Sequence, residues 1–473
     1  MPSLLRQRFA QIAPAFDLDG PGARFLQDTD VLEGAEVKAV STLLIDTPGK
    51  NTLSNNADLF VKRGGAPVMS RAAAAMALYT LSAYAPTGGA GHRTSLRGGG
   101  PLTTLVVASH RQYGDTLWGR LWPNVETSEH IAARTTEAVA PDDLAMIFPW
   151  LLATRISNTK DGGRSTTPAD VHPLQVYWGM PRRIRMLFEE AQDRLCGVTG
   201  TRDKVVVTGY RTRNYGTNYS EGFQHPLTPY YRQRAGTTSL PVHPQPGGIS
   251  YRHWPGLVVR SRDGLREPAQ VVRDVPQKHA MSGAVRFASF GFDMDNMKAR
   301  SWVESEMSLW LLDSAVARDM LERYVQHATA GADKVTWLLV RAVKSALYDR
   351  PSDAAGDYGF IAERFYRVTE GEFYLVLGSA ARLIDEQADE DDPTVQARVK
   401  WAHCLASAAL RLFDEYAPSD ALEGTNMHRH VKARFFLHLA VTGRGEPGKS
   451  LYGELGIVSP DAARARKLTQ EAT

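Results

Sequence analysis

"SRAAAAMALYTLSAYAPTGGAGHRTSLRGGGPLTTLVV", Ser70 to Val107, contains the order of elements that decides the fold class. Its alanine-rich first part, Ser70 to Tyr84, predicts a helix with Ser70 as the N-cap. The β-branched residues of "LTTLVVAS", which begins at Leu102, predict a strand. Between them lies a loop rich in glycine and basic residues, called here the glycine loop (residues 85–101). The stretch therefore predicts mixed helical and strand structure.

The order of these elements argues against a phosphate-binding P-loop. A P-loop needs a strand before its glycines, a Lys-Ser/Thr pair after them and a helix that faces the phosphates. Around "GGAGHRTS", Gly88 to Ser95, a helix comes first, a strand is expected to follow, and no Gly-Lys-Ser/Thr occurs. Two interpretations remain: a flexible connector, or backbone that approaches an anionic ligand closely because glycine has no Cβ.

In the rest of the chain the predicted secondary structure changes once, from mixed and irregular to helical, near Ser301. Ser3 to Phe16 predicts a helix, "TPGKNTLSNN" from Thr47 a polar loop, and residues 161–276 irregular β-rich structure with strand-like runs "KVVVTGY" and "GLVVRSR". From about Ser301 to Gly443 the apolar residues have helical periodicity. The expected helices are Ser314 to Tyr348, Phe360 to Ile384, Pro393 to Tyr416 and Met427 to Val441. We expect an α+β protein: a mixed, irregular α/β N-terminal domain over 1–310, then a C-terminal four-helix bundle over 311–473.

Charge is distributed unevenly although the net charge is only +3. Residues 150–280 contain 19 Lys and Arg against 10 Asp and Glu, which favours a polyanionic partner. The acidic run "DEQADEDD" from Asp385 is typical of a solvated loop. The N-terminus lacks the apolar run of a signal peptide, and two cysteines are too few for a disulfide framework, so we expect a soluble cytoplasmic protein.

Two further segments contain residues suited to nucleic acid. In "HPLTPYYRQRAGTTSLPVHPQPGGISYRHW", Arg232 and Arg234 on an expected hairpin suit a phosphate backbone, although a solvated loop is equally compatible. The irregular histidine spacing there argues against a metal site. In "GFDMDNMKARSW", Asp293 and Asp295 lack the ligand series of a calcium loop, whereas Met297 beside an amide suits a wedge between base pairs. No catalytic motif is recognisable, which favours a binding protein over an enzyme.

The series of motifs resembles one known family. "FLQD", "LLIDTPGKNTLSNNADLFVKRGG", "APTGGAGHRTSLRGGGPLTTLV", "HPLTPYYRQR", "VHPQPGGISYRHW" and "GFDMDNMKARSW", followed by a helical region, are similar to the CasA family, the large subunits of the type I-E CRISPR surveillance complex Cascade. The resemblance implies a non-enzymatic subunit of a crRNA-guided ribonucleoprotein complex in antiviral defence. Its partners would be crRNA, the other Cascade subunits, double-stranded target DNA and a helicase-nuclease. It would recognise the protospacer-adjacent motif (PAM) from the minor groove and promote R-loop formation.

The resemblance also implies site residues. The family's glycine loop corresponds to Thr87, Gly88, Gly89, Ala90 and Gly91, and its cation finger to Arg234, with Arg232 second. The strand-separating wedge corresponds to Asp295, Asn296 and Met297. Beside the glycine loop, the flanking supports would be His92, Arg93 and Arg97, with phosphate contact as a further role. A separate loop would contact the guide and the complex backbone through Asp46, Thr47, Lys50, Asn51 and Asn55.

Two departures from the family pattern matter. Many relatives have a cysteine zinc cluster near "LCGVTGTRDK", but Cys196 stands alone there, so we expect no metal and no cofactor. The family's leading segment is also expected to be missing before "LLRQRFAQIAPAF". Two alternatives stay open: a metal-dependent nuclease that uses Asp293 and Asp295, and a scaffold without nucleic-acid contact.

Overall fold

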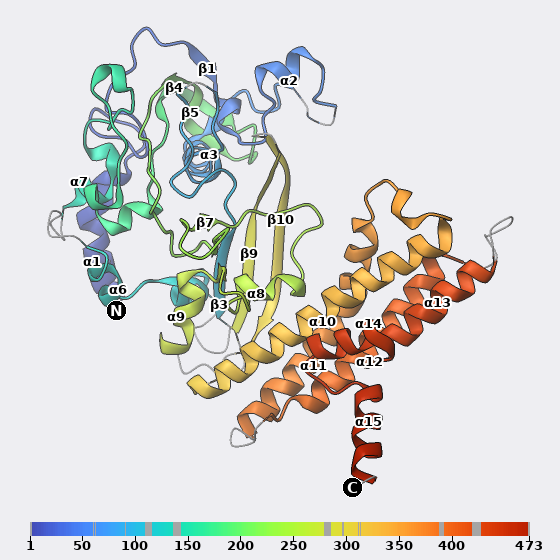
Figure 1. The fold of residues 1–473 in the computed structure, drawn as a ribbon. Coiled ribbons are helices and arrows are strands. Elements are labelled where there is room, and N and C mark those ends of the chain that lie inside the picture. Colours follow the sequence, from blue (N-terminus) through green and yellow to red (C-terminus); the bar gives the residue numbers. More distant parts are fainter. Residues whose placement is uncertain are drawn as a thin grey trace.

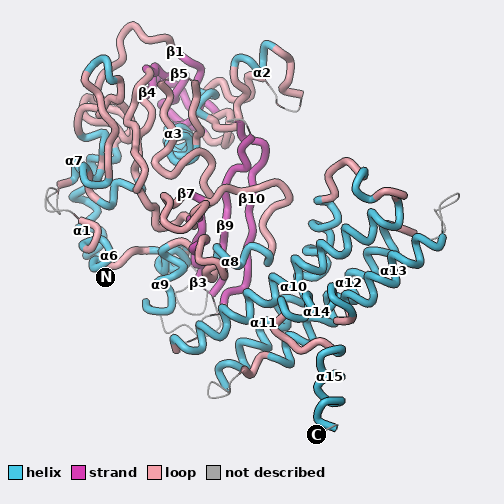
Figure 2. Tube along the Cα trace, viewed as in Figure 1, coloured by secondary structure: helices cyan, strands magenta, loops and turns pink. Residues whose placement is uncertain are grey.

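The computed structural model describes residues 2–59, 61, 63–89, 91–108, 116–135, 143–278, 285–295, 298–310, 312, 314–386, 392–418 and 427–471. Figure 1 shows two parts, one with sheets and short helices and one of long helices. Figure 2 shows the drawn strands gathered in the first part. The change falls between strand β10, which ends at Leu309, and helix α10, which begins at Ala315, so the residues from Ser301 to Leu309 are strand and not helix. The predicted α+β class is confirmed.

The first sheet is built on β5 (Arg202–Arg213), which contains the predicted strand "KVVVTGY". β5 pairs antiparallel with β4 (Arg183–Leu195), β1 (Val37–Ala39) and β2 (Met69–Ser70). Helix α3 (Arg71–Tyr84) follows β2 and packs against β5. Its cap is Ser70, whose hydroxyl accepts a hydrogen bond from the Ala73 N–H at 3.3 Å, as the sequence predicts.

Two further sheets position the segments singled out in the sequence. In the second, β9 (Val285–Asp295) pairs antiparallel with β3 (Thr103–Ala108) and β10 (Lys298–Leu309). In the third, β6 (Tyr230–Tyr231) pairs with β7 (Leu240–Pro241) and β8 (Arg266–Glu267). The predicted strand after the glycine loop is therefore β3. The run "GLVVRSR" is not a strand, because Gly256 turns the chain at φ +98° and Val259 forms only an isolated bridge with Pro255.

Short helices connect the sheets. The predicted helix from Ser3 to Phe16 is confirmed as α1 followed by a 3₁₀ turn, Ala13–Phe16. The polar loop from Thr47 contains one helical turn, α2, that the sequence did not predict. The short helices of this part are α1 (Pro2–Ile12), α2 (Lys50–Ser54), α5 (Leu117–Leu121), α6 (Ser128–Ala132), α7 (Leu144–Ile147), α8 (Trp254–Leu257) and α9 (Gln270–Lys278).

The second part contains the four predicted long helices and two more. They are α10 (Ala315–Leu347), α11 (Gly359–Glu386), α12 (Val395–Tyr416), α13 (Met427–Val441), α14 (Gly445–Glu454) and α15 (Pro460–Glu471). α10 packs against α11, α12, α13 and α14, so it is central to a helical assembly larger than the four predicted helices. None of the described helices is both long enough and apolar enough to cross a membrane.

The largest hydrophobic core joins the two parts. It runs from β3, β9 and β10 through Tyr251 and Trp254 into α10 to α14. The Tyr251 ring stacks on the Phe373 ring of α11 at 4.3 Å between centroids. A separate core lies beneath the first sheet and α3, around Trp150, Met186 and Val207. The chain therefore changes its type of secondary structure near residue 310, while its main core continues across that point.

Candidate nucleic-acid interface

The glycine loop forms a closed turn with an exposed tip. The Gly88 N–H donates to the His92 carbonyl at 3.3 Å, and the His92 N–H donates back to the Gly89 carbonyl at 3.2 Å. The Thr87 and Thr94 hydroxyls hydrogen-bond at 2.9 Å just below this turn. Gly88 and Gly89 are exposed, whereas Ala90 lies outside the described residues.

The glycines of this loop have two different physical roles. Gly89 has φ +87°, and a Cβ there would meet nothing within 4 Å, so the turn requires it while the space beyond is open. At Gly91 and Gly99 a Cβ would lie 2.7 Å from Asn214 Cβ and from Pro86 Cα, respectively. The glycines at the base of the loop therefore allow close packing, and only the tip presents backbone to an outside ligand.

The basic residues that follow the tip are turned toward the protein. Arg93 donates to the Ser157 hydroxyl at 2.8 Å and lies over the Tyr215 ring. Arg97 is buried and donates to the hydroxyls of Thr228 and Thr103, each at 2.8 Å. Burial and the neighbouring charges of Arg182 and Lys38 lower the pKa of His92 to about 4, so it is neutral near pH 7.

The supporting role of Arg93 and Arg97 stays a prediction. The Arg97 guanidinium is bonded to internal acceptors in a residue only 6% exposed, which argues against a phosphate contact for it.

The predicted cation finger is a hairpin formed by β6 and β7. Arg232 is ion-paired with Glu267 of β8 at 3.0 Å. Arg234 is exposed in the connecting turn, where the Arg234 carbonyl accepts from the Thr237 hydroxyl at 2.8 Å. Within the described residues its side chain has no ion pair. Of the two predicted arginines, Arg234 alone keeps an uncommitted charge.

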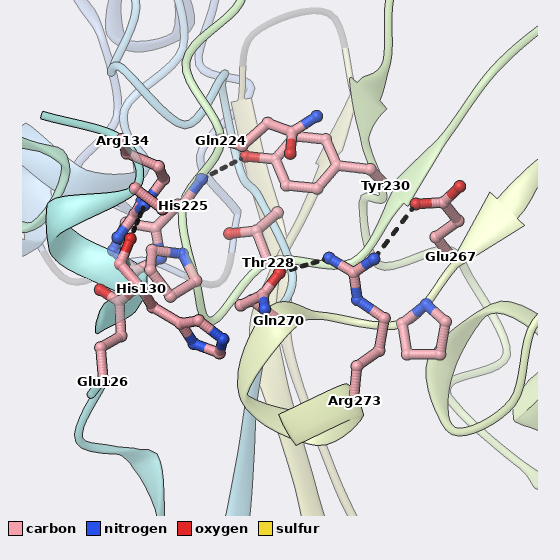
Figure 3. Close-up of a pocket in the computed structure, with 13 residues that line it drawn as sticks. Glu126, His130, Arg134, Gln224, His225, Thr228, Tyr230, Glu267, Gln270 and Arg273 are labelled. Carbon is pink, nitrogen blue, oxygen red and sulfur yellow. Dashed lines mark hydrogen bonds and ion pairs between the residues drawn. The ribbon is translucent and has the colours of Figure 1, made fainter. Parts of the chain in front are cut away.

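A cavity of about 210 Å³ lies behind this hairpin, between α6, β6, β8 and α9 (Figure 3). Its charged residues are paired with one another. Arg134 pairs with Glu126, and Arg273 donates to Gln270 at 2.5 Å and lies 3.5 Å from Glu267. Because the acidic and basic side chains pair with each other, the lining of this cavity has no surplus of positive charge to attract a phosphate.

Of the predicted wedge residues, Asp295 ends β9 and stands opposite Lys298, the first residue of β10, whereas Asn296 and Met297 lie outside the described residues. The Asp295 carboxylate lies 3.6 Å from Arg300 Nη1. Asp293 is buried, and both its carboxylate oxygens accept hydrogen bonds from Arg300 at 2.9 Å. This carboxylate therefore already has a cationic partner within the hairpin.

The predicted guide-contacting residues lie on and beside α2. Asp46, Lys50, Asn51 and Asn55 are exposed. The half-buried Thr47 donates its hydroxyl to the Ser41 carbonyl at 2.7 Å, which anchors the start of the segment. At its other end Arg63 bonds to Asp58, Asn56 and the Leu53 carbonyl. The segment is held by local bonds while its polar side chains remain accessible, and Figure 1 shows α2 at the periphery of the first part.

Three of the predicted segments meet at the base of the glycine loop. A Cβ at Gly98 would lie 3.0 Å from Pro241 of β7, and a Cβ at Gly100 would collide with Met294 of β9. The Gly100 carbonyl also lies 3.0 Å from His243 Nδ1. The structure thus brings the bases of the glycine loop, the finger hairpin and the wedge hairpin into contact.

Sequence reasoning missed Arg182, which the structure places behind the glycine loop. Its Nη2 donates to the Pro86 carbonyl at 2.6 Å. In the sequence it is one of three arginines in "PRRIR", and nothing in the pattern separates it from Arg183 or Arg185.

The described residues contain no group of three or more His, Cys, Asp or Glu placed to hold a metal ion. Cys196 is buried. Burial raises the pKa of its thiol, but hydrogen bonds from Thr199 and neighbouring backbone N–H groups outweigh this and lower it to about 6. The expected absence of zinc at this position stays a prediction.

The family model and the solved structures point to the same family. The family model of CRISPR-associated protein Cse1 matches residues 1–412. No curated protein matches the chain. CasA of Thermus thermophilus is similar at 20% identity and a TM-score of 0.58, over 95% of this chain and 82% of that chain. Cse1 of Thermobifida fusca is similar at 16% identity and a TM-score of 0.63, over 95% and 83%.

A chain of a structure titled CRISPR RNA-guided surveillance complex is also similar, at 18% identity and a TM-score of 0.60, over 93% of this chain and 82% of that chain. At these identities the structural matches show a shared fold. The family model covers most of the sequence, from the first helix to α12. The protein therefore belongs to the Cse1 family, which confirms the resemblance to the large subunit of type I-E Cascade.

Proposed function

We propose that this protein is a non-catalytic large subunit that recognises a short motif in double-stranded DNA from the minor groove. The observation that carries the proposal is the exposed tip at Gly88 and Gly89, where a Cβ at Gly89 would meet nothing within 4 Å. A minor groove about 6 Å wide admits backbone without side chains more easily than bulky groups. Arg234 on the adjoining hairpin supports the proposal, because an exposed unpaired cation suits a DNA phosphate.

The proposed setting is a cytoplasmic, crRNA-guided complex with the other Cascade subunits. The turn of the β9–β10 hairpin would separate the strands beside the motif, so that the guide can pair and an R-loop can form. The subunit would also dock the helicase-nuclease that degrades the target. Membership of the Cse1 family and the likeness to a chain of an RNA-guided surveillance complex support this setting.

The experiment changes the tip residue that has open space in front of it. Gly89→Asp and Gly89→Asn are introduced into the assembled complex, and both residues tolerate a positive φ better than other non-glycine residues. Binding is measured on duplexes with randomised sequence beside the guide-matched target. We expect Gly89→Asp to weaken binding to motif-bearing duplexes at least tenfold, because it adds negative charge where DNA backbone approaches. Gly89→Asn should lose less affinity, because it adds no charge. Equal affinity of wild type and Gly89→Asp for these duplexes would contradict the proposal.

The alternative, a metal-dependent nuclease, makes an opposite prediction for the isolated protein. The protein is incubated with duplex and single-stranded DNA in Mg²⁺ or Mn²⁺. Asp293 is buried, whereas Asp295 is exposed and lies 3.6 Å from Arg300, so the informative variant is Asp295→Ala. Reproducible cleavage that disappears in Asp295→Ala would establish the nuclease, and we expect no cleavage with either protein.

A further inference from the structure

The guanidinium of Arg182 lies directly against the tip of the glycine loop. Its Nη2 donates to the Pro86 carbonyl at 2.6 Å. A Cβ at Gly88 would lie only 2.8 Å from its Nη1, so the absence of a side chain at Gly88 leaves the room that Nη1 occupies. The cation is therefore placed immediately behind the exposed backbone.

No acid neutralises this cation within the described residues. Its Nε is buried without a hydrogen-bond acceptor. Burial lowers the pKa of Arg182 to about 10, which leaves it charged near pH 7. Its charge, together with that of Lys38, also contributes to the lowered pKa of His92. The Arg182 guanidinium is therefore a charged group without an anionic partner in the described part of the chain.

The adjacent Arg183, unlike Arg182, is paired with acidic side chains of the protein. Arg183 donates to Asp28 at 2.5 Å and lies 3.3 Å from Asp30. A partly buried charge is unfavourable unless an opposite charge compensates it. For Arg183 the protein supplies that charge, and for Arg182 the described structure does not.

We propose that Arg182 holds one backbone phosphate of the DNA duplex against which the glycine loop lies. The backbone of Gly88 and Gly89 would face the groove while the guanidinium behind them compensates the phosphate charge. Binding would supply the anion that Arg182 lacks in the free protein. This inference rests on the proposed function, because it requires that the tip meets duplex DNA.

The test is the salt dependence of duplex binding by the assembled complex. Each neutralised phosphate contributes about 0.9 to the slope of log affinity against log salt concentration. Arg182→Gln should reduce the magnitude of the slope by about 0.9, whereas Arg182→Lys, which keeps the charge, should retain it. Arg183→Gln is the matched control and should leave the slope unchanged. Thermal unfolding of each free subunit shows whether a variant folds.

The outcomes separate this inference from the proposed function. If Gly89→Asp weakens binding but Arg182→Gln keeps the wild-type slope, the phosphate site is overturned and the proposed function stands. If Gly89→Asp has no effect, the proposed function itself fails. A purely structural role for Arg182 would lower affinity without changing the slope, and Arg182→Lys would then not restore it; that result would also overturn the phosphate site.

A second variant tests the contact between Arg182 and the glycine loop by changing the loop residue, Gly88. Gly88→Ala places a methyl group 2.8 Å from Arg182 Nη1, closer than a real contact allows, and should displace the guanidinium. We expect Gly88→Ala to reduce the salt slope as Arg182→Gln does, and the double variant to differ little from either single variant, because both remove one interaction. Fully additive losses would contradict the proposal.

Discussion

At the scale of single residues, the arginines around the glycine loop differ in what compensates their charge. Arg93 and Arg97 follow the tip in sequence, yet both donate to internal oxygen acceptors. Arg182 comes from the segment before β4 and lies against the tip itself. The two arginines that follow the tip in the sequence thus have internal partners, and only the fold revealed that Arg182 lies against the exposed backbone.

Arg97 should contribute to the stability of the fold and not to the neutralisation of DNA phosphates. It is buried, donates to Thr228 and Thr103, and lies over the Tyr84 ring. Arg97→Met leaves these hydroxyls without their donor, so we expect the free energy of unfolding to fall by about 3 kcal/mol. Denaturant unfolding of the free subunit measures this loss. The salt slope of DNA binding by the folded fraction should equal that of wild type, and a reduced slope would show a phosphate contact.

At the scale of elements, two hairpins carry the remaining predicted residues, and each is pinned by an internal ion pair. Arg232 pairs with Glu267 in the finger sheet, and Asp293 pairs with Arg300 in the wedge hairpin. Arg234 lies in the exposed turn beyond the first pair, and the exposed Asp295 at the end of β9 lies 3.6 Å from Arg300. In the finger, Arg232 is therefore held within the sheet, while Arg234 remains accessible to a ligand.

The two finger arginines should respond differently to the same substitution. Arg234→Gln removes an exposed charge, so we expect weaker DNA binding on all sequences and a salt slope smaller by about 0.9. Arg232→Gln breaks the partly exposed pair with Glu267, which is worth at most about 1 kcal/mol of stability. Anisotropy titrations of both complexes at several salt concentrations make the comparison. A larger slope change in Arg232→Gln would reverse the assignment of the finger.

At the scale of the whole molecule, a continuous hydrophobic core couples the first part, with its sheets and short helices, to the long helices. Tyr251, from the first part, stacks on Phe373 and contacts the Trp401 ring of α12 at 5.8 Å between centroids. Its hydroxyl hydrogen-bonds to that of Thr369 at 2.8 Å. The two parts are therefore expected to unfold together.

Tyr251 offers a direct test of this coupling. Tyr251→Ala leaves a large cavity between the parts and should cost about 3 to 5 kcal/mol of unfolding free energy. Tyr251→Phe loses only the hydroxyl interaction and should cost about 1 kcal/mol. Calorimetry measures both variants. A loss confined to one of two separate transitions would show that the parts unfold independently.

Stability should also depend on pH through histidines buried in the neutral form. Burial and the charge of Arg252 lower the pKa of His253 to about 4, below its ordinary value near 6.5. Between pH 6.5 and 4 the unfolded chain binds a proton that folded His253 does not. Stability is therefore complete above about pH 6.5 and falls as the pH drops, by up to about 1.4 kcal/mol per pH unit for this group.

His253→Gln removes that contribution. Denaturant unfolding at several pH values should give a shallower pH dependence for His253→Gln than for wild type. His403→Gln, at an exposed position on α12, is the matched control and should follow wild type. An unchanged slope in His253→Gln would show that His253 is charged in the folded protein.

The sequence determined much of the fold through local patterns. Helical periodicity located α10 to α13, and the Ser70 cap and β-branched run located α3 and β3, because capping and amphipathicity act over a few residues. Local patterns also misjudged "GLVVRSR", where a glycine turn prevails over β-propensity. They did not predict α2, which lies in a stretch of turn-forming residues.

The sequence by itself determined the family, the α+β class and the glycine-rich tip, because these depend on motifs and local periodicity. Only the tertiary structure decided which charges are available: Arg97 and Arg232 are committed internally, Arg234 is exposed, and Arg182 lies behind the tip without a described anionic partner. The physical reason is that compensation of charge depends on groups far apart in the chain. Arg97 and Thr228 are separated by 131 residues, so no local pattern reveals their bond.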